Sequence, residues 1–143
     1  MKPLVQRILV PTDFSGRASA ALDFALLLAL QVGASLIIVH VVEPAPYDGT
    51  TSWDVLAAQH QLAAQSRLEA LIEGRTKMGL EIEAMLRKGL PWEQINVAAE
   101  ESSADLIVMG TRGRRGLGRI LAGSITESVI QTSHIPVLVV RSP

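Results

Sequence analysis

The sequence contains no cysteine, and aromatic residues occupy only 3% of its 143 positions. The absence of cysteine excludes disulfides and thiolate chemistry, and it fits a reducing compartment. The three histidines, His40, His60 and His134, lie far apart in the sequence and lack the spacing of metal ligands. Hydrophobic residues nevertheless make up 48% of the chain, so we expect a core built from aliphatic side chains.

Neither sign of charge dominates, because 13 basic and 14 acidic residues give a net charge of −1. This balance predicts no binding of nucleic acid and no attraction to an anionic membrane surface. The longest apolar runs, such as residues 24–30, are shorter than the ~18 residues of a membrane span, and the first residues lack the apolar stretch of a secretion signal. We therefore expect a soluble, cytoplasmic protein that forms one domain over residues 1–143.

Short apolar runs alternate with segments of helical periodicity along the whole chain. Such alternation predicts an α/β fold with one doubly wound, five-stranded parallel sheet, strand order 3-2-1-4-5, and helices on both faces. The predicted strands are residues 7–10, 36–42, 82–86, 106–109 and 136–141. The predicted helices run from the cap Ser15 to Gly33, from 52 to about 78, from Pro91 to about 103, and from Ser124 to about 133. The second of these helices is expected to bury Val55, Leu62, Leu68, Leu71 and Ile72.

Two polar loops are expected to flank the crevice where the strand order reverses, which is where open parallel sheets bind ligands. They are residues 11–15, after the first strand, and residues 110–123, after the fourth. The second loop holds five of the 11 glycines and four arginines, with no acid between Asp105 and Glu127. Glycines allow a ligand to approach the backbone, and a helix N-terminus attracts anions. A polyphosphate fits these features together.

Simpler interpretations exist for each feature alone. The segment 124–127 (SITE) fits a capping box, which would make Ser124 a helix cap rather than a ligand contact. A glycine-rich loop is often only a turn, and the arginines alone would be a solvated basic patch. Gly118 and Gly123 have P-loop spacing, but Ser124 stands where the lysine should be, which argues against efficient phosphoryl transfer. Arg112, Arg114 or Arg115 would supply only part of that charge.

The spacing Gly110-x2-Gly113-x9-Gly123-Ser124 resembles the ATP-binding motif of the universal stress protein family, Gly-x2-Gly-x9-Gly-Ser/Thr. The resemblance covers essentially the whole chain. Residues 8–15 (ILVPTDFS) are similar to the opening strand and loop of the family, residues 39–42 to its second strand, and residues 135–140 (IPVLVV) to its closing strand.

The resemblance implies a set of nucleotide-binding residues. Asp13 is expected at the ribose with Pro11 and Thr12 beside it, although a role in the local turn is the alternative. The backbone of Val41 is expected to contact the adenine. The ribose and phosphates are expected to lie against Met109, Gly110, Arg112 and Gly113, and against Gly123, Ser124, Ile125 and Thr126 at the start of the last helix.

The expected ligand is ATP, with Mg²⁺ as an optional companion ion, acting as a regulatory ligand in a stress response rather than as the substrate of an efficient enzyme. Asp13 is the only acid expected in the crevice, which leaves paired-carboxylate catalysis unsupported. His40 is expected to be a partly buried, hydrogen-bonded residue rather than a base. A homodimer through the apolar fifth strand is expected. A nucleotide-independent dimeric interaction module and a slow ATPase are the alternatives.

Overall fold

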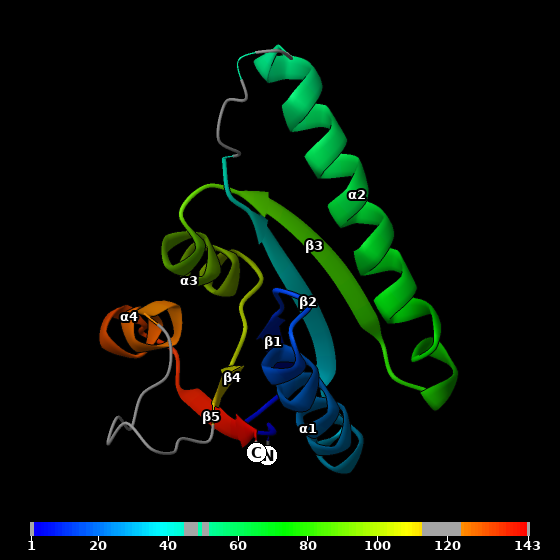
Figure 1. Ribbon diagram of the computed structural model, residues 1–143. Coiled ribbons are helices and arrows are strands. Elements are labelled where there is room, and N and C mark those ends of the chain that lie inside the picture. Colours follow the sequence, from blue (N-terminus) through cyan, green and yellow to red (C-terminus); the bar gives the residue numbers. More distant parts are fainter. Residues whose placement is uncertain (1, 45–48, 50–51, 113–123, 143) are drawn as a thin grey trace.

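The computed structural model describes residues 2–44, 49, 52–112 and 124–142. They form one five-stranded sheet in the order β3-β2-β1-β4-β5, in which every pair is parallel, as the sequence predicts (Figure 1). The strands are β1 (Arg7–Pro11), β2 (Ser35–Val42), β3 (Ile82–Lys88), β4 (Leu106–Arg112) and β5 (Val137–Ser142). The helices are α1 (Gly16–Val32), α2 (Trp53–Glu73), α3 (Pro91–Glu101) and α4 (Ser124–Thr132), with a 3₁₀ turn, η1, at Thr76–Met78.

Helices cover both faces of the sheet because successive side chains of a strand point to opposite faces. Ile8 and Val10 of β1 belong to the core cluster under α1 and α2, whereas Leu9 belongs to the cluster under α3 and α4. The two clusters are aliphatic, as the composition predicts. Within the described residues, none of the helices combines the length and apolar character that crossing a membrane requires.

The ends of α1 follow the local signals of the sequence. The Ser15 side chain accepts a hydrogen bond from the Ala18 amide at 3.3 Å and so caps the first turn. Gly33 ends the helix at φ 74°, a left-handed conformation that glycine adopts without steric cost. Ser15 thus sets where α1 begins, and Gly33 sets where it ends.

Two parts of the predicted secondary structure are wrong. The helix after residue 52 ends at Glu73 rather than near 78, and of its predicted buried residues Val55 is 48% exposed and Leu62 is 69% exposed. The N-terminal half of α2 therefore extends beyond the sheet (Figure 1). In addition, β4 continues through Gly110, Thr111 and Arg112, residues that were expected to begin the loop.

Candidate functional site

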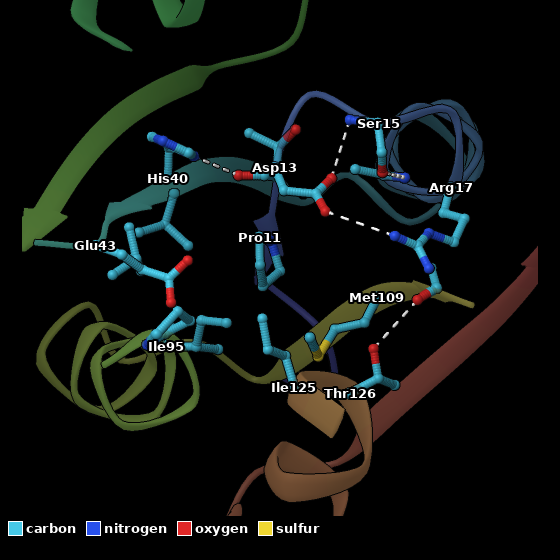
Figure 2. A pocket seen from close by; sticks show the side chains of 16 residues that line it. Pro11, Asp13, Ser15, Arg17, His40, Glu43, Ile95, Met109, Ile125 and Thr126 are labelled. Carbon is cyan, nitrogen blue, oxygen red and sulfur yellow. Dashed lines mark hydrogen bonds and ion pairs between the residues drawn. The ribbon is translucent and has the colours of Figure 1, made fainter. Parts of the chain in front are cut away.

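A cleft of about 260 Å³ lies where the carboxyl ends of β1, β2 and β4 meet, at the predicted reversal of strand order (Figure 2). Its volume is slightly below the range of about 300–1,000 Å³ for small-molecule sites. Its lining comes from the β1–α1 loop, the ends of β2 and β4, and the first turns of α1, α3 and α4. The N-termini of helices carry a partial positive charge, which attracts anions.

The β1–α1 loop is held in place by three short hydrogen bonds. The Thr12 amide donates to the Val39 carbonyl at 2.8 Å, the Phe14 amide donates to Thr12 Oγ1 at 3.0 Å, and the Ser15 amide donates to Asp13 Oδ1 at 2.9 Å. Phe14 has φ 65°, which is strained for a bulky residue, so these bonds offset a real backbone cost. The loop is thus a defined wall of the cleft.

Asp13 lines the cleft from the β1–α1 loop. Burial raises the pKa of Asp13, but hydrogen bonds from Ser15 and the positive charge of Arg17 outweigh this effect and lower the pKa below its ordinary value. Arg17 Nη2 lies 3.9 Å from Asp13 Oδ2. Asp13 is therefore ionised at neutral pH, and its side chain remains 60% exposed. The alternative role of Asp13 in the local turn is also real, because its carboxylate accepts the Ser15 amide.

His40 is a hydrogen-bonded, partly buried residue, as expected. Its Nδ1 lies 2.7 Å from the Thr12 carbonyl, and since a carbonyl can only accept, Nδ1 is the donor. Its ring also packs against Phe14, with the ring centroids 4.6 Å apart. His40 therefore supports the β1–α1 loop from β2.

The β4 side of the cleft depends on a close approach between β4 and α1. A Cβ added at Gly110 would lie 2.2 Å from the Arg17 carbonyl oxygen, so only glycine fits there. The buried Thr126 hydroxyl donates to the Gly110 carbonyl at 3.2 Å and ties the start of α4 to β4. The sequence motif suggested a ligand contact for Gly110, whereas this packing requirement was not expected.

Glu43 also lines the cleft, so the expectation of a single acid there is wrong. It follows the end of β2, beyond the apolar residues Val39 and Val41, and Figure 2 shows its side chain on the same side of the cleft as Ile95. The sequence did not predict that Glu43 lines the cleft, because it did not show how far beyond Val42 the wall of the cleft continues.

Eight of the residues predicted from the sequence line this one cleft: Pro11, Thr12, Asp13, Val41, Met109, Gly110, Ile125 and Thr126. Gly113 and Gly123 lie outside the described residues, as do the side chains of Arg112 and Ser124, whose backbones end β4 and begin α4. Ser15 also lines the cleft, as part of the loop 11–15 that was expected there, although no ligand contact was assigned to it. The sequence interpretation missed seven other lining residues: Arg17, Ala18, Val39, His40, Glu43, Pro91 and Ile95. The cap at Ser15 and the helix-starting Pro91 were available signals, since both mark helices that begin at the crevice.

Known proteins are similar to this chain over nearly its whole length. The model of the universal stress protein family matches residues 5–141. The chain belongs to the universal stress protein family. A universal stress protein of Methanocaldococcus jannaschii, MJ0531, is 36% identical to it over 98% of this chain and 84% of that protein.

Solved structures of universal stress proteins share the fold. MJ0577 of M. jannaschii superposes with a TM-score of 0.84 at 30% identity, covering 98% of both chains. A universal stress protein of Archaeoglobus fulgidus in complex with dAMP superposes with a TM-score of 0.67 at 27% identity, covering 95% of this chain and 98% of that one. At least one protein of this fold therefore binds an adenine nucleotide.

Proposed function

We propose that this universal stress protein binds ATP in the cleft and that the nucleotide acts as a regulatory, conformational ligand in a stress response. The observation that carries the proposal is the convergence of eight predicted residues, drawn from four separate segments, on one cleft at the strand-order reversal. The dAMP complex of the A. fulgidus relative supports an adenine nucleotide as the ligand class. We place the protein in the cytoplasm, as one nucleotide-binding domain over residues 1–143.

The lining of the cleft suggests how the nucleotide would lie. Val39 and Ile95 belong to one buried aliphatic cluster and Val41 packs against it, which offers the dry wall that a base requires. The Val41 backbone would contact the adenine edge, and the ionised Asp13 would accept hydrogen bonds from the ribose hydroxyls. The phosphates would then extend toward Gly110 and Thr126, and the sequence between these two residues contains Gly113 and Gly123.

The proposed role is binding rather than efficient catalysis. His40 Nδ1 is engaged by the Thr12 carbonyl, and no lysine stands at the P-loop position of the sequence. Mg²⁺ would enter with the triphosphate, because protein-bound Mg²⁺ usually shares its coordination with substrate phosphates. ATP binding would favour one conformation of the protein, and a partner protein would recognise that conformation.

We also propose a homodimer through β5. This strand stands at the edge of the sheet and pairs only with β4 among the described residues. Its residues 137–140 are aliphatic and all partly exposed. Exposed apolar edge strands tend to pair with another strand, and a second copy of β5 would satisfy this one. Sedimentation should give a dimer at micromolar concentration, and a monomer there would exclude this arrangement.

Equilibrium dialysis with ATP tests the function, and a turnover assay with Mg²⁺ accompanies it. Saturable binding of one ATP per chain with negligible phosphate release is the expected result. No binding would favour the nucleotide-independent interaction module, and steady phosphate release would favour the slow ATPase. Nucleotide that copurifies with the protein would be identified by mass spectrometry of the denatured sample.

A further inference from the structure

Arg17 is a basic residue of the cleft that belongs to α1 and not to the glycine-rich loop 110–123. It occupies the first turn of the helix, lines the cleft, and has a side chain that is 33% exposed. Figure 2 shows it reaching toward Asp13 on the side of the cleft where Met109 and Thr126 lie. Its backbone is fixed there as well, because its carbonyl oxygen packs against Gly110.

This position is electrostatically unfavourable for an arginine. The N-terminus of a helix carries a partial positive charge, which disfavours cations in the first turn, and α1 has no acid in that turn to compensate. Among the described residues, the Arg17 guanidinium makes one ion pair, with Asp13 at 3.9 Å, and no hydrogen bond. That distance is too long for a hydrogen bond, so the donors of the guanidinium remain available to a ligand.

We propose that Arg17 is a phosphate-binding residue of this cleft, and that nucleotide binding transfers its guanidinium from Asp13 to a phosphate. The planar fork of an arginine suits two phosphate oxygens, and a partly buried cation is less screened by solvent than a surface one. The same exchange frees the Asp13 carboxylate to accept hydrogen bonds from the ribose. In the protein without ligand, the ion pair holds the Arg17 guanidinium and the Asp13 carboxylate side by side at the edge of the cleft. The inference rests on the proposed function, because it assumes that an adenine nucleotide occupies the cleft.

Calorimetric titration of the parent and Arg17→Gln with ATP and with adenosine tests this assignment. Arg17→Gln should lower ATP affinity about tenfold, the loss of one charge-assisted hydrogen bond, and change adenosine affinity less than about twofold. Arg17→Lys should lose less, because it keeps the charge but not the fork. Thermal unfolding of Arg17→Gln should stay within about 2 °C of the parent, because the ion pair with Asp13 is long and the helix N-terminus disfavours a cation.

Arg75→Gln is the matched control. Arg75 is also a partly buried arginine paired with a single aspartate, Asp23, at 3.7 Å, but it lies outside the cleft. This variant makes the same change in net charge and should bind ATP as the parent does. Equal ATP affinity in Arg17→Gln and the parent, or an equal loss for ATP and adenosine, overturns the assignment of Arg17 alone. A parent that binds neither compound overturns the proposed function and this inference with it.

Discussion

The end of the cleft formed by β2 and α3 carries Val39, Val41 and Ile95 beside the acid Glu43, whereas the end formed by α1, β4 and α4 carries Arg17 and Thr126 beside Met109 and Ile125. Val39 and Ile95 at the first end are core residues that also face the cleft. At the second end, Arg17 and Thr126 stand beside the close approach of Gly110 to α1. An adenine base is largely apolar and a triphosphate is charged, so we expect them to bind at different ends of the cleft. Mutations at the two ends should therefore change ligand affinity and its salt dependence in different ways.

The largest expected effect is on stability, at Gly110. Gly110→Ala places a Cβ 2.2 Å from the Arg17 carbonyl oxygen, a clash with backbone that no rotamer change relieves. We expect the free energy of unfolding to fall by about 3 kcal/mol, at the upper end for overpacking, as measured by urea denaturation. Gly16→Ala is the control, because a Cβ there meets nothing within 4 Å. Its stability should equal that of the parent or exceed it slightly. Equal stability of the two variants would show that β4 and α1 are not in close contact.

Gly113 and Gly123 are predicted to affect binding rather than folding. Valine at either position would place a branched side chain where phosphate oxygens approach the backbone. ATP affinity should fall roughly 10- to 150-fold for each charge-assisted hydrogen bond lost, while the free energy of unfolding changes by only ~1 kcal/mol. Adenosine affinity should be unchanged in both variants, because only the phosphate end is altered. Parent-like ATP binding in both would place the phosphates elsewhere.

Ser124→Ala separates two roles that the sequence leaves open. A residue that only caps α4 loses ~1 kcal/mol of stability on this change and leaves ATP affinity as it was. A phosphate ligand loses affinity for ATP as well. Thermal unfolding without nucleotide and an ATP titration on the same variant distinguish the two roles.

The phosphate end should make binding depend on phosphate number and on salt. ATP should bind more tightly than ADP, and ADP more tightly than AMP, because the cationic and amide groups lie at that end. Raising the ionic strength from about 0.1 M to 1 M shortens the screening length from about 10 Å to 3 Å, so ATP affinity should fall. Adenosine serves as the uncharged control. AMP affinity equal to that of ATP, measured by calorimetry, would contradict the idea of a triphosphate end.

The smallest expected effect is the pH dependence of Asp13. Its pKa is lowered in the folded protein, so the ionised carboxylate stabilises the fold at pH values above the ordinary pKa of about 4. That contribution is lost as the pH falls through the folded pKa. The difference in free energy of unfolding between the parent and Asp13→Asn should therefore be constant from about pH 7 to 5 and change only below about pH 4. A difference that does not vary with pH would mean that the charge of Asp13 is not stabilised by Ser15 and Arg17.

The two helices on one face of the sheet show how far sequence patterns predict this fold. The buried residues of α1, such as Leu22 and Leu26, follow the helical periodicity of the sequence, because α1 packs along β4, β5 and β1. In α2 the same approach failed at Val55 and Leu62, which lie in the N-terminal half of the helix and are exposed. A 21-residue helix is about 31 Å long, and the seven-residue strand β3 is only about 23 Å long. Periodicity identifies a helix but not where its neighbours end.

Sequence patterns also predicted only part of the site. The carboxyl ends of the predicted strands and the glycine motif located Asp13, Val41 and Thr126, since parallel strands bring those ends to one edge of the sheet. Arg17 and Glu43 were missed because neither belongs to a motif. Arg17 lines the cleft because of which side of the first turn of α1 faces β4. Glu43 lines it because the wall of the cleft continues past the end of β2.

A crystal structure of the protein grown with ATP tests the central claim most directly. The account predicts density for adenine beside the Val41 backbone, ribose at Asp13, and phosphates at the Gly110–Thr126 end within reach of Arg17. Density for the nucleotide in the reverse orientation, or at another surface of the molecule, would contradict it.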